Sequence, residues 1–493
     1  MKVIFTLTFF IWGLFLGAQH SFQTHLPSLM EDGIYGSIHL NAFETSSNFI
    51  VAVANREEFF SASETRQLYF YDKSGKFSHS KEIPNEIDKQ LYKTQLFEFA
   101  HRYALLFNSL YQSNDSSVSI RIAHYDSLFN LEKIIEIDSV DGFLAFNNIL
   151  NPDGEIIICY STLQNKNFGY SITLAIVDIT TGKVKQEKIV ANNIYGGAIS
   201  FNYFPKDSSY LIYSKQGAFR TNNKFDLTDS IPFFSAHGAA RKLLSSEKSL
   251  IYDNYREDTL PFSEKSVDVW LVDSKGKKGT FKHSGEANLK FGKADIDDNT
   301  IFQNLDFIEE NSIYISFASN FKINPGYPFE KKDTEVGLSK FQADGKVLWT
   351  KYYSDSTYAV PIKTMATSDG GALLVCNKYD WRNTTGNFND IWIIKVDSNG
   401  TFNSEDPNLG VGIIDYQANN KITVYPNPAK NEITFKNQEE NSNLKIYNTN
   451  GTLVFESVIG KLKTIDITDF NIGVYFYSVQ NKSDVVSGKF VKE

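Results

Sequence analysis

Hydrophobic positions along most of this chain come in short runs that end in polar turns, and the same unit recurs. Leu68–Tyr71 is followed by Asp72-Lys73-Ser74-Gly75, and Trp392–Val396 is followed by Asp397-Ser398-Asn399-Gly400. Asp, Ser, Asn and Gly favour tight turns, so each unit predicts a strand, a turn and a new strand. With the acidic turn residue as a marker, the units lie at Asp72, Asp126, Asp178, Asp226, Asp273, Asp344 and Asp397.

A second apolar run precedes each marker, as Glu155–Tyr160 and Ala372–Cys376 show. A repeat of roughly fifty residues has room for about four short strands, and such evenly spaced strands are typical of a β-propeller. The pattern predicts an all-β fold, with a β-propeller of seven blades over residues 19–410. Residues 403–410 are polar and turn-rich, and they are expected to close the last blade. A stack of β-sandwiches and a β-solenoid remain the alternatives.

The C-terminal residues follow a different pattern. Pro426-Asn427-Pro428 predicts an extended entry to a strand at Glu432–Phe435, because proline removes a backbone donor and restricts the residue before it. Leu444–Tyr447 and Thr452–Phe455 flank Asn448-Thr449-Asn450-Gly451, which predicts a hairpin. Gly473 precedes another strand, Val474–Val479. Short strands at this spacing favour a small antiparallel sandwich.

These segments, together with Gly488-Lys489-Phe490-Val491-Lys492-Glu493 at the end, closely resemble the type A C-terminal sorting domain of the type IX secretion system of Bacteroidota. The resemblance implies an immunoglobulin-like β-sandwich at residues 421–493, after a linker at 411–420. It also implies two partners, the outer-membrane type IX translocon and its sorting machinery, with removal of the domain during attachment to surface lipopolysaccharide. The expected sorting motif is Pro426, Asn427, Pro428, Asn450, Gly451, Gly473, Tyr475, Lys489 and Lys492.

The N-terminus carries an export signal of its own. Lys2 precedes the apolar run Val3–Leu16, and Gly17-Ala18 offers a small-residue cleavage site, so residues 1–18 are predicted to be a signal peptide. No other apolar run is long enough for a transmembrane segment. The two signals together predict a protein that is secreted or attached to the outer cell surface, by way of the periplasm. Residues 338–400 also resemble the degenerate propeller repeats of exported Bacteroidota proteins.

Composition narrows the class of protein further. The net charge is −9, and no dense cluster of Lys and Arg occurs, which argues against a nucleic-acid partner. The two cysteines, Cys159 and Cys376, lie in similar apolar runs that fall in non-adjacent repeats. We therefore expect both to be buried and not joined to each other, because a disulfide needs Cα atoms within about 7 Å.

Candidate chemistry is sparse. The eight histidines show no metal-ligand spacing, and no nucleophile elbow occurs. Asp295–Thr300 begins like a calcium loop, but Thr300 replaces the glycine and Asp306 replaces the bidentate glutamate, so it is interpreted as a solvated acidic turn. Tyr379-Asp380-Trp381-Arg382 could stack on a sugar or a peptide, or fold onto its own blade.

The sequence therefore names no catalytic residue, cofactor or metal. Binding or adhesion, with a glycan or protein ligand, is the favoured function. A structural surface component and an extracellular polysaccharide or peptide hydrolase or lyase are the alternatives, because the fold does not choose between them.

Overall fold

The computed structural model describes residues 21–25, 37–56, 64–83, 94–110, 118–164, 169–195, 197–214, 216–232, 240–243, 247–256, 265–293, 304–319, 334–354, 357–379, 390–401, 422–436, 441–449, 452–480 and 485–493. Every regular element within these residues is a β-strand. The chain divides into two compact units, Met1–Ile413, here called the body, and Ile414–Glu493, here called the tail. The predicted all-β class is confirmed.

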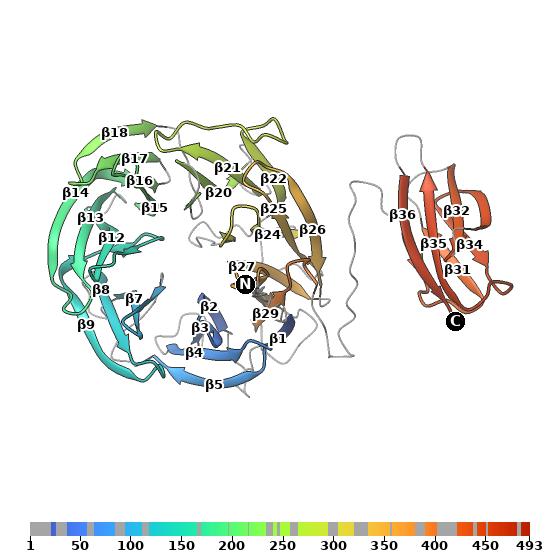
Figure 1. Cartoon of the computed structure of the whole chain (residues 1–493), viewed down its shortest axis with the longest axis horizontal. Coiled ribbons are helices and arrows are strands. Elements are labelled where there is room, and N and C mark those ends of the chain that lie inside the picture. Colours follow the sequence, from blue (N-terminus) through green and yellow to red (C-terminus); the bar gives the residue numbers. More distant parts are fainter. Residues whose placement is uncertain are drawn as a thin grey trace, which may run out of the picture. The chain divides into compact units, whose positions relative to one another are not determined.

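The body strands form antiparallel sheets whose members follow one another in the sequence, and these sheets are arranged in a ring (Figure 1). The strands of the first four sheets are β2 (Ser37–Glu44), β3 (Asn48–Arg56), β4 (Glu64–Asp72) and β5 (Phe77–Glu82); β6 (Thr94–Phe99), β7 (Arg102–Leu110), β8 (Val118–Tyr125) and β9 (Leu131–Asp141); β10 (Phe143–Leu144), β11 (Ile149–Leu150), β12 (Glu155–Leu163), β13 (Gly169–Asp178) and β14 (Val184–Tyr195); and β15 (Ala198–Phe204), β16 (Ser209–Ser214), β17 (Gly217–Asn222) and β18 (Leu227–Pro232).

The rest of the ring is an eight-stranded sheet and a four-stranded sheet. The eight-stranded sheet has two halves, and among the described residues the pairing of β22 with β24, at Lys293 and Ala318, is what joins them. Its strands are β19 (Ala240–Lys242), β20 (Lys248–Arg256), β21 (Lys265–Asp273), β22 (Asn288–Lys293), β23 (Leu305–Phe307), β24 (Ile313–Ser319), β25 (Glu335–Phe341) and β26 (Val347–Tyr353). The last sheet has the order β27 (Tyr358–Ala366), β28 (Ala372–Tyr379), β29 (Asp390–Val396) and β1 (Phe22–His25).

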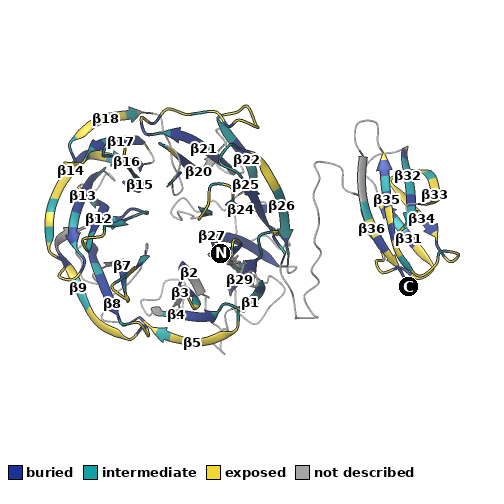
Figure 2. Ribbon diagram, in the orientation of Figure 1, coloured by how far each residue is buried: buried dark blue, intermediate teal, exposed yellow. Residues whose placement is uncertain are grey.

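Each body sheet buries both of its faces, one against the sheet before it and one against the sheet after it. On β12, Ile156 and Ile158 pack toward the β6–β9 sheet, whereas Ile157 and Cys159 pack toward the β15–β18 sheet. A strand that is covered on both sides reads as a continuous apolar run, which explains the run at residues 156–160. Exposed residues concentrate on the outer strands, such as β5 and β18 (Figure 2).

The ring is closed by the N-terminal strand. β1 pairs antiparallel with β29, from Phe22 opposite Lys395 to His25 opposite Trp392. Phe22 is buried in the cluster between the last sheet and the first, with its ring 5.9 Å from that of Phe49. A Cβ on Gly75, whose φ is +86°, would lie 2.0 Å from the Phe22 ring, so this turn needs glycine for space as well as for its backbone. The repeat pattern did not predict that β1 would complete the last sheet. Residues 403–410, which were expected to close the last blade, lie outside the described residues.

In the predicted turns, a side-chain oxygen accepts hydrogen bonds from backbone N–H groups of the same turn. Asp72 Oδ1 accepts hydrogen bonds from the backbone N–H groups of Ser74 and Lys76, at 2.9 and 3.0 Å. Asp126, Asp273 and Asp397 repeat this arrangement, and Asp178 accepts instead from the N–H groups of Thr180 and Thr181. Hydrogen bonds from Thr180 and Thr181, of which the one from the Thr180 hydroxyl has the largest effect, together lower the pKa of the Asp178 carboxyl to about 2. In these five units an aspartate is therefore the residue that organises the turn.

Two of the seven markers are wrong by a few residues. In the fourth unit the capping side chain is Asn222, whose Oδ1 accepts from the N–H groups of Lys224 and Asp226. In the sixth unit the turn begins at Gln342, whose N–H donates to Lys346 O, and Asp344 lies two positions further on. In the fourth unit an amide oxygen is the acceptor in place of a carboxylate, so a search for Asp alone misplaced that marker at Asp226. In the sixth unit the side-chain acceptor is still an aspartate, Asp344, but it lies two positions after the start of the turn.

The tail contains two sheets that share one hydrophobic core. One sheet has the order β30-β31-β34, and the other has the order β33-β32-β35-β36. The predicted hairpin is confirmed, because β32 and β33 pair and Asn448 Oδ1 accepts from Thr452 N–H at 2.9 Å. The tail strands are β30 (Thr423–Tyr425), β31 (Glu432–Lys436), β32 (Ser442–Asn448), β33 (Leu453–Ile459), β34 (Leu462–Asp466), β35 (Gly473–Gln480) and β36 (Val485–Lys492).

Candidate functional site

The Pro426–Pro428 segment is fastened to the last strand of the tail. Asn427 Oδ1 accepts a hydrogen bond from Val491 N–H at 2.9 Å. Ala429 is fully buried; its N–H donates to Val491 O, and its carbonyl accepts from Glu493 N–H, both at 2.8 Å. The segment and β36 are therefore held together although they are distant in the sequence. A hollow of about 540 Å³ lies beside them, lined by Pro426, Pro428, Lys430, Asn431, Glu432 and Glu493.

Most of the remaining predicted sorting residues lie on β35 and β36. Gly473 pairs with Lys492, so both lie close to the Pro426–Pro428 segment. The Tyr475 ring stacks on Phe490 at 5.4 Å, and its hydroxyl donates to Asn471 O at 2.9 Å. Lys489 is exposed on the outer face, opposite Phe476. Asn450 and Gly451 lie outside the described residues.

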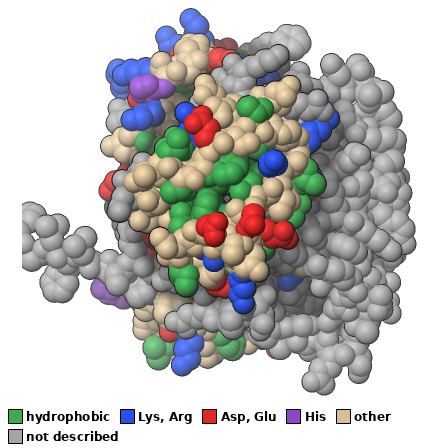
Figure 3. All heavy atoms as spheres, turned by 90° about the vertical axis from the view of Figure 1, so that its right-hand side faces the viewer, with side chains coloured by type: hydrophobic (Ala, Val, Ile, Leu, Met, Phe, Trp, Pro, Cys, Tyr) green, Lys and Arg blue, Asp and Glu red, His purple; other side chains and the backbone are tan. Residues whose placement is uncertain are grey.

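The outer face of the β33-β32-β35-β36 sheet carries exposed apolar side chains. Phe476 is 47% exposed, and it pairs with Tyr447 on one side and with Lys489 on the other. Figure 3 shows hydrophobic side chains gathered on a face of the molecule, with acidic and basic side chains around them. Other exposed apolar residues of this sheet are Leu453, Val454, Val458, Val474 and Val491.

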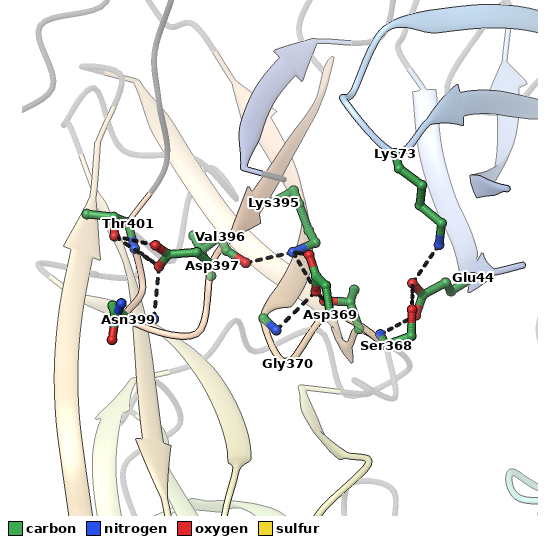
Figure 4. A network of polar contacts seen from close by, with 12 residues as sticks. Glu44, Lys73, Ser368, Asp369, Gly370, Lys395, Val396, Asp397, Asn399 and Thr401 are labelled. Atoms are coloured by element: carbon green, nitrogen blue, oxygen red, sulfur yellow. Dashed lines mark hydrogen bonds and ion pairs between the residues drawn. The ribbon is translucent and has the colours of Figure 1, made fainter. Parts of the chain in front are cut away.

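In the body, a polar network spans the seam at which the ring closes (Figure 4). Glu44, at the end of β2, accepts from Lys73 Nζ at 2.6 Å and from Ser368 N–H and Oγ–H, both at 2.8 Å. Ser368 lies in the turn between β27 and β28, 324 positions from Glu44. The carboxylate therefore links the first sheet to the last.

The same turn holds a buried ion pair. The Lys395 side chain has no exposed surface, and its Nζ lies 2.9 and 3.1 Å from the Asp369 carboxylate and 2.8 Å from Val396 O. Burial raises the pKa of Asp369, but hydrogen bonds from Thr367 and Lys395 outweigh it and hold that pKa below its usual value. Burial also lowers the pKa of Lys395, and Asp369 opposes that shift. The pair is internally satisfied, which gives it a structural role.

A cavity of about 300 Å³ adjoins the seam on the inner strands. Its lining comes from four sheets: Ala42, Phe43 and Glu44 from the first, Leu96, Glu98 and Tyr103 from the second, Asp306 from β23, and Lys363 and Met365 from β27. The lining thus combines apolar side chains with three carboxylates and one amine, a mixture that suits recognition of a polar ligand.

Asp306 belongs to a charged group at the edge of this cavity. Its Oδ1 lies 2.8 Å from Nη2 of Arg241 on β19, and its Oδ2 accepts from Ala366 N–H at 3.0 Å. Burial lowers the pKa of Lys363 to about 8, against the attraction of Asp306 and with the repulsion of Arg241. The carboxylate that was weighed as a calcium ligand is therefore engaged with an arginine.

Sequence reasoning did not find this cavity. The charged lining residues are far apart in the sequence and share no motif; they are Glu44, Glu98, Asp306 and Lys363. The one sequence feature that could have indicated their proximity is that each lies on the first strand of a repeat. Asp295–Thr300 and residues 380–382 of the aromatic segment fall outside the described residues. Cys159 and Cys376 are buried on different sheets and form no disulfide, as predicted.

Residues 423–493 match the family described as the secretion system C-terminal sorting domain. The predicted type IX sorting domain is thereby confirmed, and it marks the chain for export to the cell surface or secretion. Among the residues that the structure describes, no helix has the length and apolar character to cross a membrane. No curated protein matches the chain.

Several solved structures are similar to the chain at low identity. The Neurospora crassa Pan2 WD40 domain is 9% identical, with 76% of this chain and 96% of that chain covered and a TM-score of 0.40. The polysaccharide lyase Uly1 is 9% identical, with 75% and 91% covered and a TM-score of 0.41. PorZ of Porphyromonas gingivalis, described as an essential bacterial surface component of the type IX secretion system, is 9% identical, with 94% and 99% covered and a TM-score of 0.19. These likenesses are too weak to assign a function.

Proposed function

We propose that this chain is an exported ligand-binding protein, delivered outside the cell by the type IX secretion system. Residues 1–18 would be removed as the signal peptide, and residues 19–410 would form a seven-bladed β-propeller. Residues 411–420 would link it to an immunoglobulin-like sandwich at 421–493, which the translocon and the sorting machinery recognise. The propeller serves binding or adhesion toward a glycan or protein ligand.

Three features support the propeller with seven blades. Four body sheets follow the inner-to-outer order of consecutive strands, and the eight-stranded sheet divides into two more groups at its single joining pair. The last group is completed by β1. Each neighbouring pair of groups then shares one hydrophobic cluster, including the last and the first. Closure of this kind leaves no unpaired face within the ring.

The cavity on the inner strands is the observation that carries the binding function. It is about 300 Å³ in volume, at the lower end of the range typical of ligand pockets. Its lining is assembled from separate sheets that hydrogen bonds join to one another. Asn41 Nδ2 donates to Thr94 O between the first and second sheets, and Asn304 Nδ2 donates to Pro361 O at 3.0 Å, beside β23 and β27. Such a lining is held in place before a ligand arrives, which lowers the entropy cost of binding.

A glycan and peptide array probed with recombinant residues 19–410 tests the binding function. We expect selective retention of one ligand class by the wild-type body and its loss in Glu98→Gln and Lys363→Met. Lys282→Met and Glu286→Gln are the matched controls, because both residues are exposed and lie outside the lining of the cavity. Equal retention by all five proteins would show that the cavity is not the binding site.

Export is tested separately. N-terminal sequencing of the mature protein should begin at Gln19, and a mature chain that starts at Met1 would overturn the signal peptide. Truncation from residue 421 should leave a folded body in the periplasm, because the body and the tail have separate cores. Undiminished surface display of the truncated protein would contradict the sorting role of the tail.

A further inference from the structure

The outer face of the four-stranded tail sheet is apolar at positions where such a face is usually polar. In β35, Tyr475 and Tyr477 pack into the tail core, so the residues between and before them, Phe476 and Val474, point outward. Phe476 is 47% exposed and Val474 is 36% exposed. A sheet with one covered face normally alternates apolar residues inward with polar residues outward. β35 therefore carries apolar side chains on both faces although its core covers one.

These outward side chains are contiguous across the sheet. Tyr447 of β32 pairs with Leu453 of β33 and with Phe476 of β35, so the three side chains form a row over three strands. Val474 pairs with Val491 of β36 in a second row, two positions further along β35. Cross-strand neighbours lie about 5 Å apart, and residues i and i+2 of a strand about 7 Å apart, so the two rows are in contact. These five residues are here called the apolar face.

Exposed apolar residues in the body have a different distribution. Phe77 is the first residue of β5 and Leu227 is the first residue of β18, and they are 41% and 48% exposed. Both are followed by polar residues, as the sequences FSHSKE and LTDSIP show. Single exposed apolar residues are normal, whereas a contiguous group marks an interaction site. The apolar face of the tail therefore needs a partner.

The size of the apolar face indicates what kind of partner it fits. Four strands about 4.8 Å apart and two rows of side chains about 7 Å apart give an area on the order of 300 Å². A stable complex buries about 800 Å² on each partner. The face is therefore too small to hold a second copy of the chain permanently, and it suits a transient contact. A sorting signal requires such a contact, because it has to be released after it has been recognised.

The apolar face also adjoins the predicted sorting residues. Val474 directly follows Gly473, and the N–H of Val491 donates to Asn427 Oδ1 at 2.9 Å. Gly473 and Asn427 both belong to the predicted sorting motif, and residues 423–493 match the secretion sorting family. The apolar face and these motif residues thus lie at the same end of one sheet.

An unpaired charge lies beside the apolar face. Lys489 pairs with Phe476 across the strands, and its side chain is exposed. Lys445 of the same sheet forms an ion pair with Glu456 at 3.4 Å, whereas Lys489 has no such partner among the residues that the structure describes. A carboxylate on a partner would form a charge-assisted hydrogen bond with Lys489 next to the Phe476 ring.

We propose that the apolar face is the surface by which the type IX export machinery recognises the tail. The partner is a protein surface that presents apolar side chains to Phe476 and a carboxylate to Lys489. A half-exposed aromatic ring at the centre of the face is the kind of side chain that contributes most to a protein interface. This assignment rests on the proposed export function and names the surface that carries it.

Substitutions in the full-length protein test this surface. Export to the surface and the medium is measured in a Bacteroidota host with an active type IX system. Phe476→Asp should lower export about tenfold or more, because it brings an unpaired charge into an apolar contact, and Phe476→Leu should be exported as the wild type is. Leu462→Asp is the matched control, because Leu462 is an apolar residue of β34, in the other sheet, and is 61% exposed.

Lys489 and a crosslink test the chemistry of the partner. Lys489→Glu should lower export, and Lys489→Arg should not; undiminished export of Lys489→Glu would overturn the carboxylate of the partner. Replacement of Phe476 by photoreactive benzoylphenylalanine should yield a crosslink to an outer-membrane component of the type IX machinery. Crosslinks to a second copy, or within the same chain, in place of that component would overturn the proposal.

The outcomes separate this proposal from the export function itself. Normal export of Phe476→Asp, together with loss of export on truncation from residue 421, would overturn the apolar face and leave the export function intact. Undiminished export of the truncated protein would overturn both. An equal loss in Phe476→Asp and Leu462→Asp would overturn the proposal, because the effect would not be specific to this face. Thermal unfolding verifies that each variant is folded, and the crosslink decides the question if Phe476→Asp is not.

Discussion

Neighbouring residues on a strand have different environments in the body and in the tail. Leu373 and Leu374 of β28 are both fully buried, one toward the first sheet and one toward the β24–β26 strands. Phe476 and Tyr477 of β35 are 47% and 9% exposed, because the tail sheet is covered on one face. The period of the hydrophobic pattern therefore indicates how many faces of a sheet are covered. A continuous apolar run indicates that both faces are covered, and alternation indicates that one face is covered.

The largest expected effect comes from removing the strand that closes the ring. Deletion of residues 19–25 takes Phe22 from its cluster and leaves β29 as an open edge. Such an edge invites aggregation, so we expect the body to lose solubility and cooperative unfolding while the tail keeps its fold. Size-exclusion chromatography and denaturant unfolding measure this, and a variant that lacks only residues 19–21 is the control.

The single substitution Phe22→Ala should destabilise the soluble body by about 3–5 kcal/mol, the usual cost of removing a buried phenylalanine ring. If the deleted body remains monomeric and unfolds as the wild type does, the ring does not depend on β1 and the closed arrangement is wrong.

Ion pairs provide the next contrast. Asp369→Asn leaves the buried Lys395 ammonium without its carboxylate and should cost the body about 3–5 kcal/mol. In the tail, Glu456→Gln breaks the Lys445–Glu456 pair, whose side chains are 37% and 44% exposed, and should cost far less than Asp369→Asn because water screens the pair. Urea unfolding of the separate units measures both, and equal costs would contradict the burial of the Lys395 pair.

The pair also predicts a pH dependence. The folded-state pKa of Asp369 is lowered, so its contribution is complete above the unfolded value of about 3.9 and is lost as the pH falls through the folded value. Wild-type body should therefore lose stability relative to Asp369→Asn as the pH drops below about 4. A difference between the two proteins that does not change with pH in this range would show that the carboxylate is not charged in the folded state.

Alanine substitution of neighbouring residues tests the two burial patterns directly. Leu373→Ala and Leu374→Ala should each destabilise the body by about 2–5 kcal/mol. In the tail, Tyr477→Ala should cost about 3–5 kcal/mol and Phe476→Ala well under half of that, since its ring is already half in water. A large cost at Phe476 in the isolated tail would mean that its outer face is covered by something within the tail.

The last prediction concerns the Pro426–Pro428 segment. Asn427→Ala leaves the exposed Val491 N–H to water in place of its side-chain acceptor and should destabilise the tail by about 0.5–1.5 kcal/mol, with no change in the body. Separate unfolding of the two units measures it. Lys489→Ala is the control, because that side chain is exposed on the outer face. A body that is destabilised by Asn427→Ala would contradict the independence of the two cores.

The sequence predicted the strands and their turns well because these depend on local chemistry. Asp72, Asp178 and Asp397 cap turns within four or five residues, so a local search detects them. The marker at Asp226 was wrong because Asn222 takes the capping position, and the marker at Asp344 was wrong because the acceptor of that turn lies two positions after its start. The tail was identified from its motif. The contact between the Pro426–Pro428 segment and the strand that carries Lys492 was not predicted, because it joins residues distant in the sequence.

The closing strand and the cavity could not be predicted in the same way. β1 has only four residues and lacks a repeat around it, so nothing local distinguishes it from other short apolar segments. Glu98, Asp306 and Lys363 meet because the ring brings the first strands of distant repeats together. Their proximity is a property of ring closure, which no short window of sequence contains.

Ring closure by β1 also sets the order in which the body can finish folding. A chain that crosses a membrane from its N-terminus delivers the closing strand first and its partner β29 last. Contacts between residues so far apart in the sequence form slowly, because the loop between them must close before the contact contributes. Until β29 emerges, the early sheets can pair internally while the ring stays open. The pairing of β1 with β29 therefore completes the fold only after the whole body has reached one side of the membrane.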